Sequence, residues 1–333
     1  VNSKGFETSA ILGFFNSIFD LKRRENPDYL SVVFDKGGSA DRSAIYSEYK
    51  SNRNATPEVI LDSVPYIYNI LNGLGITTLD LEGYEADDII GTVAKRAEKK
   101  DFEVYMVTPD KDFAQLVTEN IFLYKPARFG NDIEIMGVQE INKKFEIDSP
   151  IKVIDYLGMM GDSVDNIPGI PGVGDKTAKK FLKDYGSIEG LYKNTHNLKG
   201  KLKEKVEDNQ ELAMLSKKLA TIITDVPIKY NLENLKISKP SNEIIISIFE
   251  ELEFKRLKEN YFKLFKQKDD HEIKEQSTSK VEYKGKFVSQ QISGKTGILL
   301  LKQNLQKIKI FSFDIKYYEN DIYLFFCWSK ASV

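Results

Sequence analysis

Short apolar runs alternate along this chain with longer segments in which apolar residues recur at helical spacing. The runs cover residues 29–35 and 102–108. Short β-branched and aromatic runs predict buried parallel strands, whereas apolar residues at every third or fourth position predict helices with one face toward a core. Helical spacing marks residues 60–71, 83–99 and 244–252. The pattern predicts an α/β fold, with a parallel sheet flanked by helices and a mostly helical carboxyl half.

Two of these predicted helices supply much of the expected core, because their apolar positions form one continuous face. The core positions are Ile60, Val64, Ile67, Ile70 and Leu71 in the first, and Ile244, Ile245, Ile248, Phe249 and Leu252 in the second. We expect an α/β core over residues 1–150 and a helical subdomain over residues 151–265. A polar, charged stretch without apolar period predicts a linker over residues 266–286. The remaining stub, 287–333, is strand-like at 296–301 and 308–313.

Acidic residues cluster where the predicted strands end and where one helix begins. Asp35 closes the first strand, and Asp110 and Asp112 follow the second. Open α/β sheets bind ligands at the carboxyl ends of their strands. The helix start adds Glu85, Asp87 and Asp88. Each group alone is explained by helix capping and the helix dipole. Together the carboxylates would repel one another without cations, so they indicate bound Mg²⁺ or Mn²⁺.

A further run, residues 161–178, combines acids with a glycine-rich segment. Asp162 and Asp165 are three apart, so on a helical turn they would share one face. Three glycines permit positive φ and close approach to a ligand, and the helix that follows offers free N–H groups to a phosphate. Alone, such a run is an ordinary acidic turn before a capped helix. With the other acids it indicates metal and phosphate binding, by Gly169, Gly172, Gly174, Lys176, Thr177, Lys179 and Lys180.

The motifs at residues 83–88, 108–112 and 161–169 resemble, in order and spacing, the 5′ nuclease domain of bacterial DNA polymerase I. The resemblance covers about residues 1–265 and implies a PIN-like core followed by a helix–three-turn–helix subdomain. It implies a Mg²⁺-dependent 5′→3′ exonuclease and flap endonuclease that removes primers and damaged strands. It also implies a K⁺ ion at the glycine hairpin, and two metal ions held by Asp35, Glu85, Asp87, Asp88, Asp110, Asp112, Asp162 and Asp165.

Residues 41–53 interleave basic and aromatic side chains and resemble the family's helical arch over a single-stranded 5′ end. The residues are Arg42, Tyr46, Tyr49, Lys50 and Arg53. We expect the cations to offset phosphate charge and the tyrosines to stack on unpaired bases. A solvated polar helix is the alternative. The predicted catalytic residues are Lys50, Arg53, Glu85 and Asp112.

Both ends of the chain depart from the family pattern. In the family, a strand that supplies a metal ligand, and a helix, come before the segment that residues 1–5 resemble. We therefore expect an amino-terminally truncated fragment with weak or no nuclease activity. Residues 311–314 resemble the first strand of a 3′→5′ exonuclease domain, but Lys316 stands where active versions carry glutamate. The stub is therefore predicted to be the start of a degenerate domain without proofreading.

Composition narrows the chemistry further. The 48 basic and 50 acidic residues give a formal charge of −2, which does not exclude DNA binding because local patches decide it. A single cysteine, Cys327, excludes an internal disulfide. His196 and His271 lie in polar surroundings, which argues against histidine catalysis or a zinc site. No apolar run is long enough for a membrane span.

These observations predict a bacterial cytoplasmic monomer that acts on DNA at 5′ flaps, nicks and RNA-primed duplexes. A non-catalytic, structure-specific DNA-binding module is the main alternative. An RNA-directed nuclease of PIN-like architecture also explains the acids, but it leaves the glycine hairpin without a role.

Overall fold

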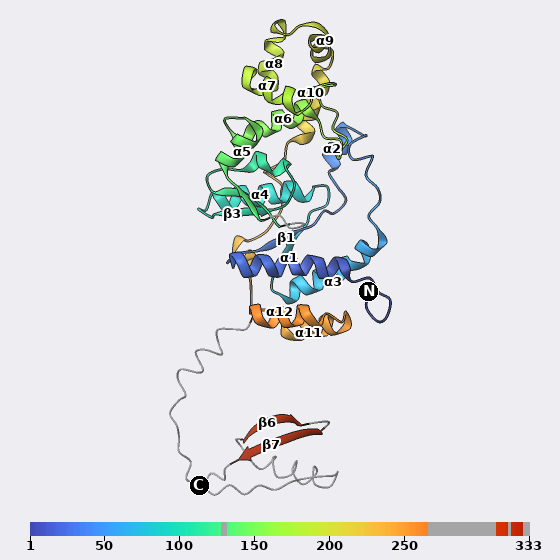
Figure 1. Ribbon diagram of the computed structural model, residues 1–333, viewed down its shortest axis with the longest axis vertical. Coiled ribbons are helices and arrows are strands. Elements are labelled where there is room, and N and C mark those ends of the chain that lie inside the picture. Colours follow the sequence, from blue (N-terminus) through green and yellow to red (C-terminus); the bar gives the residue numbers. More distant parts are fainter. Residues whose placement is uncertain (128–131, 266–310, 319–320, 329–333) are drawn as a thin grey trace. The chain divides into compact units, whose positions relative to one another are not determined.

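The computed structural model describes residues 1–127, 132–265, 311–318 and 321–328. The chain divides into two compact units, Val1–Gln267 and Lys268–Val333 (Figure 1). In the second unit, β6 (Phe311–Tyr318) pairs antiparallel with β7 (Asp321–Trp328). The predicted linker and the predicted strand at 296–301 lie outside the described residues.

The first unit carries the remaining helices and strands. The strands are β1 (Ser31–Val33), β2 (Thr77–Leu79), β3 (Val104–Val107), β4 (Ile121–Lys125) and β5 (Glu134–Met136). The helices of its first half are α1 (Ser9–Glu25), α2 (Ala40–Ile45), α3 (Glu58–Gly73), α4 (Ala86–Glu98), η1 (Asp112–Leu116), α5 (Val138–Phe145) and η2 (Pro150–Lys152). Those of its second half are α6 (Val153–Met160), α7 (Asp175–Tyr185), α8 (Ile188–Lys193), η3 (Thr195–Asn197), α9 (Gly200–Asp208), α10 (Gln210–Ala220), η4 (Leu232–Leu235), α11 (Asn242–Glu251) and α12 (Lys255–Phe265).

The strands of this unit form two sheets, where the sequence predicts one parallel sheet. β1 and β2 are parallel, with Ser31 opposite Thr77. β3 and β4 are also parallel, but β5 returns antiparallel, with Leu123 opposite Met136. The connection between β4 and β5 is too short for the crossover that a parallel pair requires, so the chain turns back on itself. The α/β class is confirmed, and the single parallel sheet is replaced by one parallel pair and one mixed sheet in the described part of the chain.

One hydrophobic cluster joins helices that are far apart in the sequence of the first unit. α1 packs against α3 and α12, and α11 packs against α3 and α12. Most predicted core positions lie in this cluster, including Ile70 and Phe249, which are at most 1% exposed. Ile60 and Ile244 are 42% and 39% exposed. Both belong to the first turns of their helices, which extend past the covered face, so the prediction that they are core residues is wrong.

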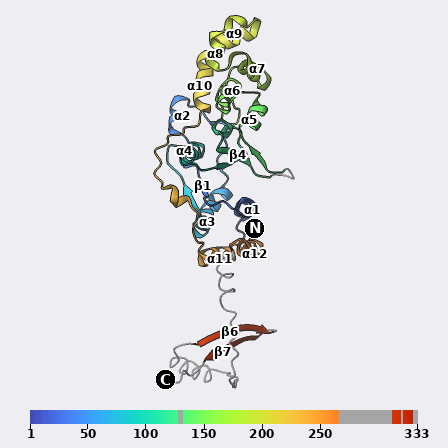
Figure 2. The ribbon, with the colours of Figure 1, turned by 90° about the vertical axis from the view of Figure 1, so that its left-hand side faces the viewer.

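The helical second half packs around α6, which contacts α7, α8 and α10. Figure 1 shows α7, α8 and α9 at one end of this unit and α11 and α12 at the other, and Figure 2 shows the same order after a quarter turn. η1, which directly follows the predicted acids after β3, contacts α6. The acids of the first half therefore lie where the sheets meet the helical half. No helix in the described residues is both long and apolar enough to cross a membrane.

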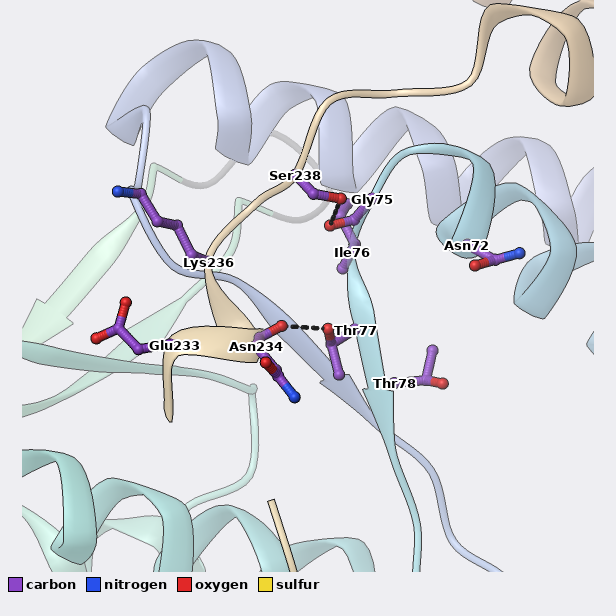
Figure 3. Close-up of a pocket in the computed structure, with 9 residues that line it drawn as sticks. All are labelled: Asn72, Gly75, Ile76, Thr77, Thr78, Glu233, Asn234, Lys236 and Ser238. Carbon is purple, nitrogen blue, oxygen red and sulfur yellow. Dashed lines mark hydrogen bonds between the residues drawn. The ribbon is translucent and has the colours of Figure 1, made fainter. Parts of the chain in front are cut away.

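A polar pocket of about 550 Å³ lies at the opposite edge, where β2 begins (Figure 3). Thr77 Oγ1 donates a hydrogen bond to the carbonyl of Asn234 at 2.6 Å across its wall. The side chains of Lys236 and Thr78 point away from one another (Figure 3). Because its polar groups do not converge and it adjoins the amino end of a parallel strand, this pocket is not the candidate site.

Candidate active site

The first group of acids is assembled by the ends of β1 and β3 and the start of α4. Asp35 follows β1, and its Oδ1 accepts a hydrogen bond from the backbone N–H of Ala86 at 2.7 Å. Asp35 thereby holds the first turn of α4, which is capped by Glu85. After β3, Asp110 Oδ1 accepts from the N–H of Asp112 at 2.9 Å. Local backbone bonds thus aim carboxylates from three segments at one region.

The electrostatics of this group favour a bound cation. Burial, together with the charge of Asp110, raises the pKa of Asp87 to about 7. The same two causes raise the pKa of Asp112 to about 7. Asp112 Oδ1 is also buried without a hydrogen-bond partner, which is costly for a carboxylate. An oxygen-only donor set with an unsatisfied buried oxygen suits a hard divalent cation such as Mg²⁺ or Mn²⁺.

The second group of acids belongs to a turn, residues 162–167, which we call the acidic turn. Asp162 and Ile167 exchange two backbone hydrogen bonds, of 2.9 and 2.7 Å. Asp162 and Asp165 therefore belong to a tight antiparallel turn, in which Asn166 has positive φ, and not to a helical turn. Asp162 Oδ2 lies 2.8 Å from the ammonium of Lys111. Although burial opposes it, this contact lowers the pKa of Asp162.

Residues 48–53, which we call the arch turn, dock onto the acidic turn. The N–H of Lys50 donates to the carbonyl of Asp165 at 3.0 Å. The side-chain amide of Asn52 donates to the carbonyl of Ser163 at 2.7 Å. In the other direction, the amide of Asn166 donates to the carbonyl of Glu48 at 2.7 Å and to Ser51 Oγ at 3.2 Å. The two turns are thus held together by one backbone hydrogen bond and by the amide side chains of Asn52 and Asn166.

Docking places the Lys50 ammonium between the two groups of acids. Its Nζ lies 2.7 Å from Glu85 Oε1 and 3.6 Å from Asp165 Oδ2. Arg53 also pairs with Asp165. Lys50 adopts φ of +56°, a conformation that non-glycine residues rarely adopt outside constrained sites. The two cations predicted to be catalytic thus both contact predicted metal-binding carboxylates.

Arg42 and Asp88 do not occupy the positions that the sequence predicts. Arg42 is 5% exposed and donates to both oxygens of Asp88, at 2.7 and 2.8 Å. Its remaining donors reach the carbonyls of Leu219 and Thr221, at 3.0 and 2.8 Å. Asp88 is fully buried and also accepts from the N–H of Ile223. The predicted DNA contact of Arg42 and the predicted metal contact of Asp88 are therefore replaced by an internal ion pair that joins α2, α4 and the end of α10.

The two tyrosines predicted to stack on unpaired bases, Tyr46 and Tyr49, also face the interior of the protein. Tyr49 is 8% exposed, and its hydroxyl donates to Glu85 Oε2 at 3.1 Å. It therefore orients a carboxylate instead of stacking on a base. Tyr46 is half-buried and packs against the core. Both rings face inward because the arch turn is docked, a tertiary effect that local sequence does not encode.

The eight predicted carboxylates do not gather into one cluster. Across the described part of the chain, no three His, Cys, Asp or Glu side chains lie close enough together to hold a metal ion. Instead, three of the acids form ion pairs with basic side chains of the chain itself. The pairs are Lys50 with Glu85, Lys111 with Asp162, and Arg53 with Asp165. These pairs relieve the mutual repulsion that the sequence predicts.

The glycine hairpin leads into α7 as predicted. Gly169 and Gly172 have φ of +66° and +85°. Gly174 has φ of −107° and is the N-cap of α7, so it does not use this freedom. A Cβ on Gly169 would lie 2.5 Å from the backbone nitrogen of Gly161, so two backbone segments touch there. Lys176 and Lys180 are exposed, whereas Lys179 pairs with Asp175 at 3.1 Å.

Three residues at the site have no role in the sequence interpretation: Lys111, Asn52 and Asn166. The signal for Lys111 is its position between two predicted metal ligands, where a cation is well placed to pair with another acid. The two asparagines act on backbone carbonyls of a segment more than 100 residues away. Nothing local in the sequence indicates such partners.

A family model described as the 5'-3' exonuclease N-terminal resolvase-like domain matches residues 1–146, and one described as the 5'-3' exonuclease C-terminal SAM fold matches residues 148–243. The chain belongs to the 5'-3' exonuclease family. The predicted resemblance to a 5′ nuclease family is confirmed by this match.

Relatives of the 5'-3' exonuclease family include separate exonucleases and longer polymerases. The chain is 41% identical over 265 residues to the 5'-3' exonuclease of Aquifex aeolicus, covering 80% of this chain and 89% of that protein. It is 40% identical over 259 residues to DNA polymerase I of Bacillus subtilis, covering 78% of this chain. It spans 29% of the length of that polymerase.

Among solved structures, the bacteriophage T5 D15 flap endonuclease, in a complex with DNA and metal ions, matches with a TM-score of 0.56 at 18% identity. The match covers 77% of this chain and 91% of that one. It shows a shared fold, in agreement with the predicted PIN-like core and helical subdomain.

Proposed function

We propose that this chain is the 5′→3′ exonuclease and flap endonuclease region of a DNA polymerase I. It would hydrolyse phosphodiester bonds at 5′ ends and flaps during primer removal and repair. The observation that carries the proposal is that the Lys50 ammonium contacts both Glu85, from the first group of acids, and Asp165, from the second. The exonuclease of Aquifex aeolicus, which the chain covers almost entirely, supports the same activity.

The proposed metal ligands exclude the buried Asp88. One Mg²⁺ or Mn²⁺ would be held by the first group, Asp35, Glu85, Asp87, Asp110 and Asp112, and a second by Asp162 and Asp165. When bound, such ions supply hydroxide from water and stabilise the leaving 3′-oxygen. Glu85 is oriented for this task by Tyr49, and Asp35 by the first turn of α4.

The rest of the site would bind and orient DNA. Lys50 and Arg53 offset the negative charge of the phosphate at the cleavage position. The glycine hairpin and the first turn of α7 offer backbone N–H groups to duplex phosphates, assisted by Lys176, Thr177 and Lys180 and by a K⁺ ion at the hairpin. The substrates would be 5′ flaps, nicks and RNA-primed duplexes, bound by a monomer.

The test uses the purified chain and a 5′-flap duplex labelled at its 5′ end, in Mg²⁺ and in EDTA. We expect weak cleavage, with short 5′ products only in Mg²⁺. Asp112→Asn removes a proposed ligand, whereas Asp148→Asn changes an exposed aspartate that pairs only with Lys152 among described residues. Loss of cleavage in the first variant and not in the second supports the proposal. Flap binding without cleavage by the wild-type chain would favour the non-catalytic module.

A further inference from the structure

We propose that Lys50 is an internal counter-ion that competes with divalent metal for Glu85 and Asp165, so that metal binding releases the Lys50 side chain from the acids. The inference rests on the proposed function, because it assigns a means of regulation to the same site. It links the two events that cleavage requires, loading of metal and freeing of a cation for the phosphate.

The two oxygens of Glu85 are held in different ways. Oε2 accepts from the hydroxyl of Tyr49 at 3.1 Å and from the buried guanidinium of Arg42 at 3.3 Å. Oε1 contacts the Lys50 ammonium at 2.7 Å. Arg42 is fixed by four further hydrogen bonds, whereas Lys50 ends a flexible stem. Oε1 is therefore the oxygen whose partner can be exchanged without disturbing the core.

A metal ion at Oε1 and the Lys50 ammonium exclude one another. Both are cations, and both would use the same lone pairs of Glu85. The ammonium also lies 3.6 Å from Oδ2 of Asp165, a second carboxylate for which a metal would compete. The ammonium is a compact charge on four methylenes, so it can swing away while its backbone stays in place. Once displaced, it is free to contact a phosphate. The acids are thus neutralised in either state, first by the chain and then by the metal.

The arch turn also holds Lys50 in a conformation that its backbone does not favour. Its φ of +56° is maintained by the hydrogen bond from its own N–H to Asp165 and by the side chain of Asn52 on Ser163. Weakening this docking should weaken the hold of Lys50 on Glu85. Because coupling between two binding events is reciprocal, Lys50 weakens metal binding by the same factor by which metal weakens the hold of Glu85 on Lys50. A change that loosens Lys50 should therefore strengthen metal binding.

The experiment is calorimetric titration of Mn²⁺ into the full chain without DNA. We expect Lys50→Gln to bind Mn²⁺ about tenfold more tightly than wild type, and Asn52→Ala about threefold more tightly. Lys258→Gln removes the same charge from a lysine paired with Glu250 on distant helices and should bind as wild type does. If Asn52 only maintained the structure, its loss would weaken metal binding. Unchanged or weaker binding by Lys50→Gln overturns the inference.

A second measurement uses only the wild-type chain, so its result does not depend on whether a variant folds. Amines of the wild-type chain are acetylated briefly with and without Mg²⁺, and the modification of Lys50 and Lys258 is compared by mass spectrometry. We expect Mg²⁺ to raise the labelling of Lys50 severalfold and leave Lys258 unchanged. Equal labelling of Lys50 in both conditions contradicts the release. If the wild-type chain takes up no metal by titration, the proposed function itself fails, which separates the two outcomes.

Discussion

Replacing Arg42 by methionine should be among the most destabilising single changes in the first unit. The guanidinium holds Asp88 through two hydrogen bonds, and it also satisfies the carbonyls of Leu219 and Thr221. Removing one partner of a buried ion pair costs about 3–5 kcal/mol, because the other charge stays buried. We expect the variant to lose about that much free energy of unfolding. The melting temperature should fall by roughly 6 to 20 °C for a unit of this size.

The assay is equilibrium urea unfolding followed by circular dichroism. Arg256→Met, at an exposed position of α12, is the matched control and should unfold with wild-type stability. Adding Asp88→Asn to Arg42→Met should recover part of the loss, because the uncompensated charge is removed. A cost below about 1 kcal/mol for Arg42→Met, or a double variant less stable than the single one, would refute the account of this ion pair.

Three further changes test other parts of the structure. Gly169→Ala should lower the free energy of unfolding by at least about 2 kcal/mol, since a side chain there is strained and meets the backbone of Gly161; Gly174→Ala, with open space at its Cβ, should change it little in the same urea titration. Asp112→Asn should reduce flap cleavage in Mg²⁺ at least about 100-fold while leaving flap affinity in Ca²⁺ intact, as measured by fluorescence anisotropy. Lys180→Gln should weaken duplex binding and reduce the salt slope of log K by about 1, whereas Lys258→Gln should leave both unchanged.

Local patterns were sufficient for the elements that carry the acids. β1, α4 and β3 are each specified by a short apolar run or a periodic face with acids at one end, so Asp35, Glu85 and Asp110 are found where the sequence predicts them. β2 has no counterpart in the sequence prediction, because Thr77–Leu79 is only three residues long. The features that were predicted depend on neighbours within about 20 residues, which a single sequence displays directly.

The errors concern partners far apart in the chain. Arg42 and Tyr49 sit in a polar stretch that predicts an exposed arch, yet their partners are 46 and 36 positions away in α4 and its cap. The pairing of Lys50 with Asp165 spans an even longer loop. Charge pairs between residues far apart in the sequence form only in the folded structure, so no periodic pattern in the sequence indicates them.

The pairing of α1 and α3 with α11 and α12 has a consequence for synthesis on the ribosome. The apolar faces of the first two helices are covered by residues such as Phe249 and Tyr261. Asn242, where α11 begins, follows the end of α3 at Gly73 by 169 positions. At the usual pace of translation, roughly 8 to 34 s pass before the covering helices are made. During that interval the growing chain exposes the apolar surface of these helices, so this protein should depend on chaperones that bind nascent chains.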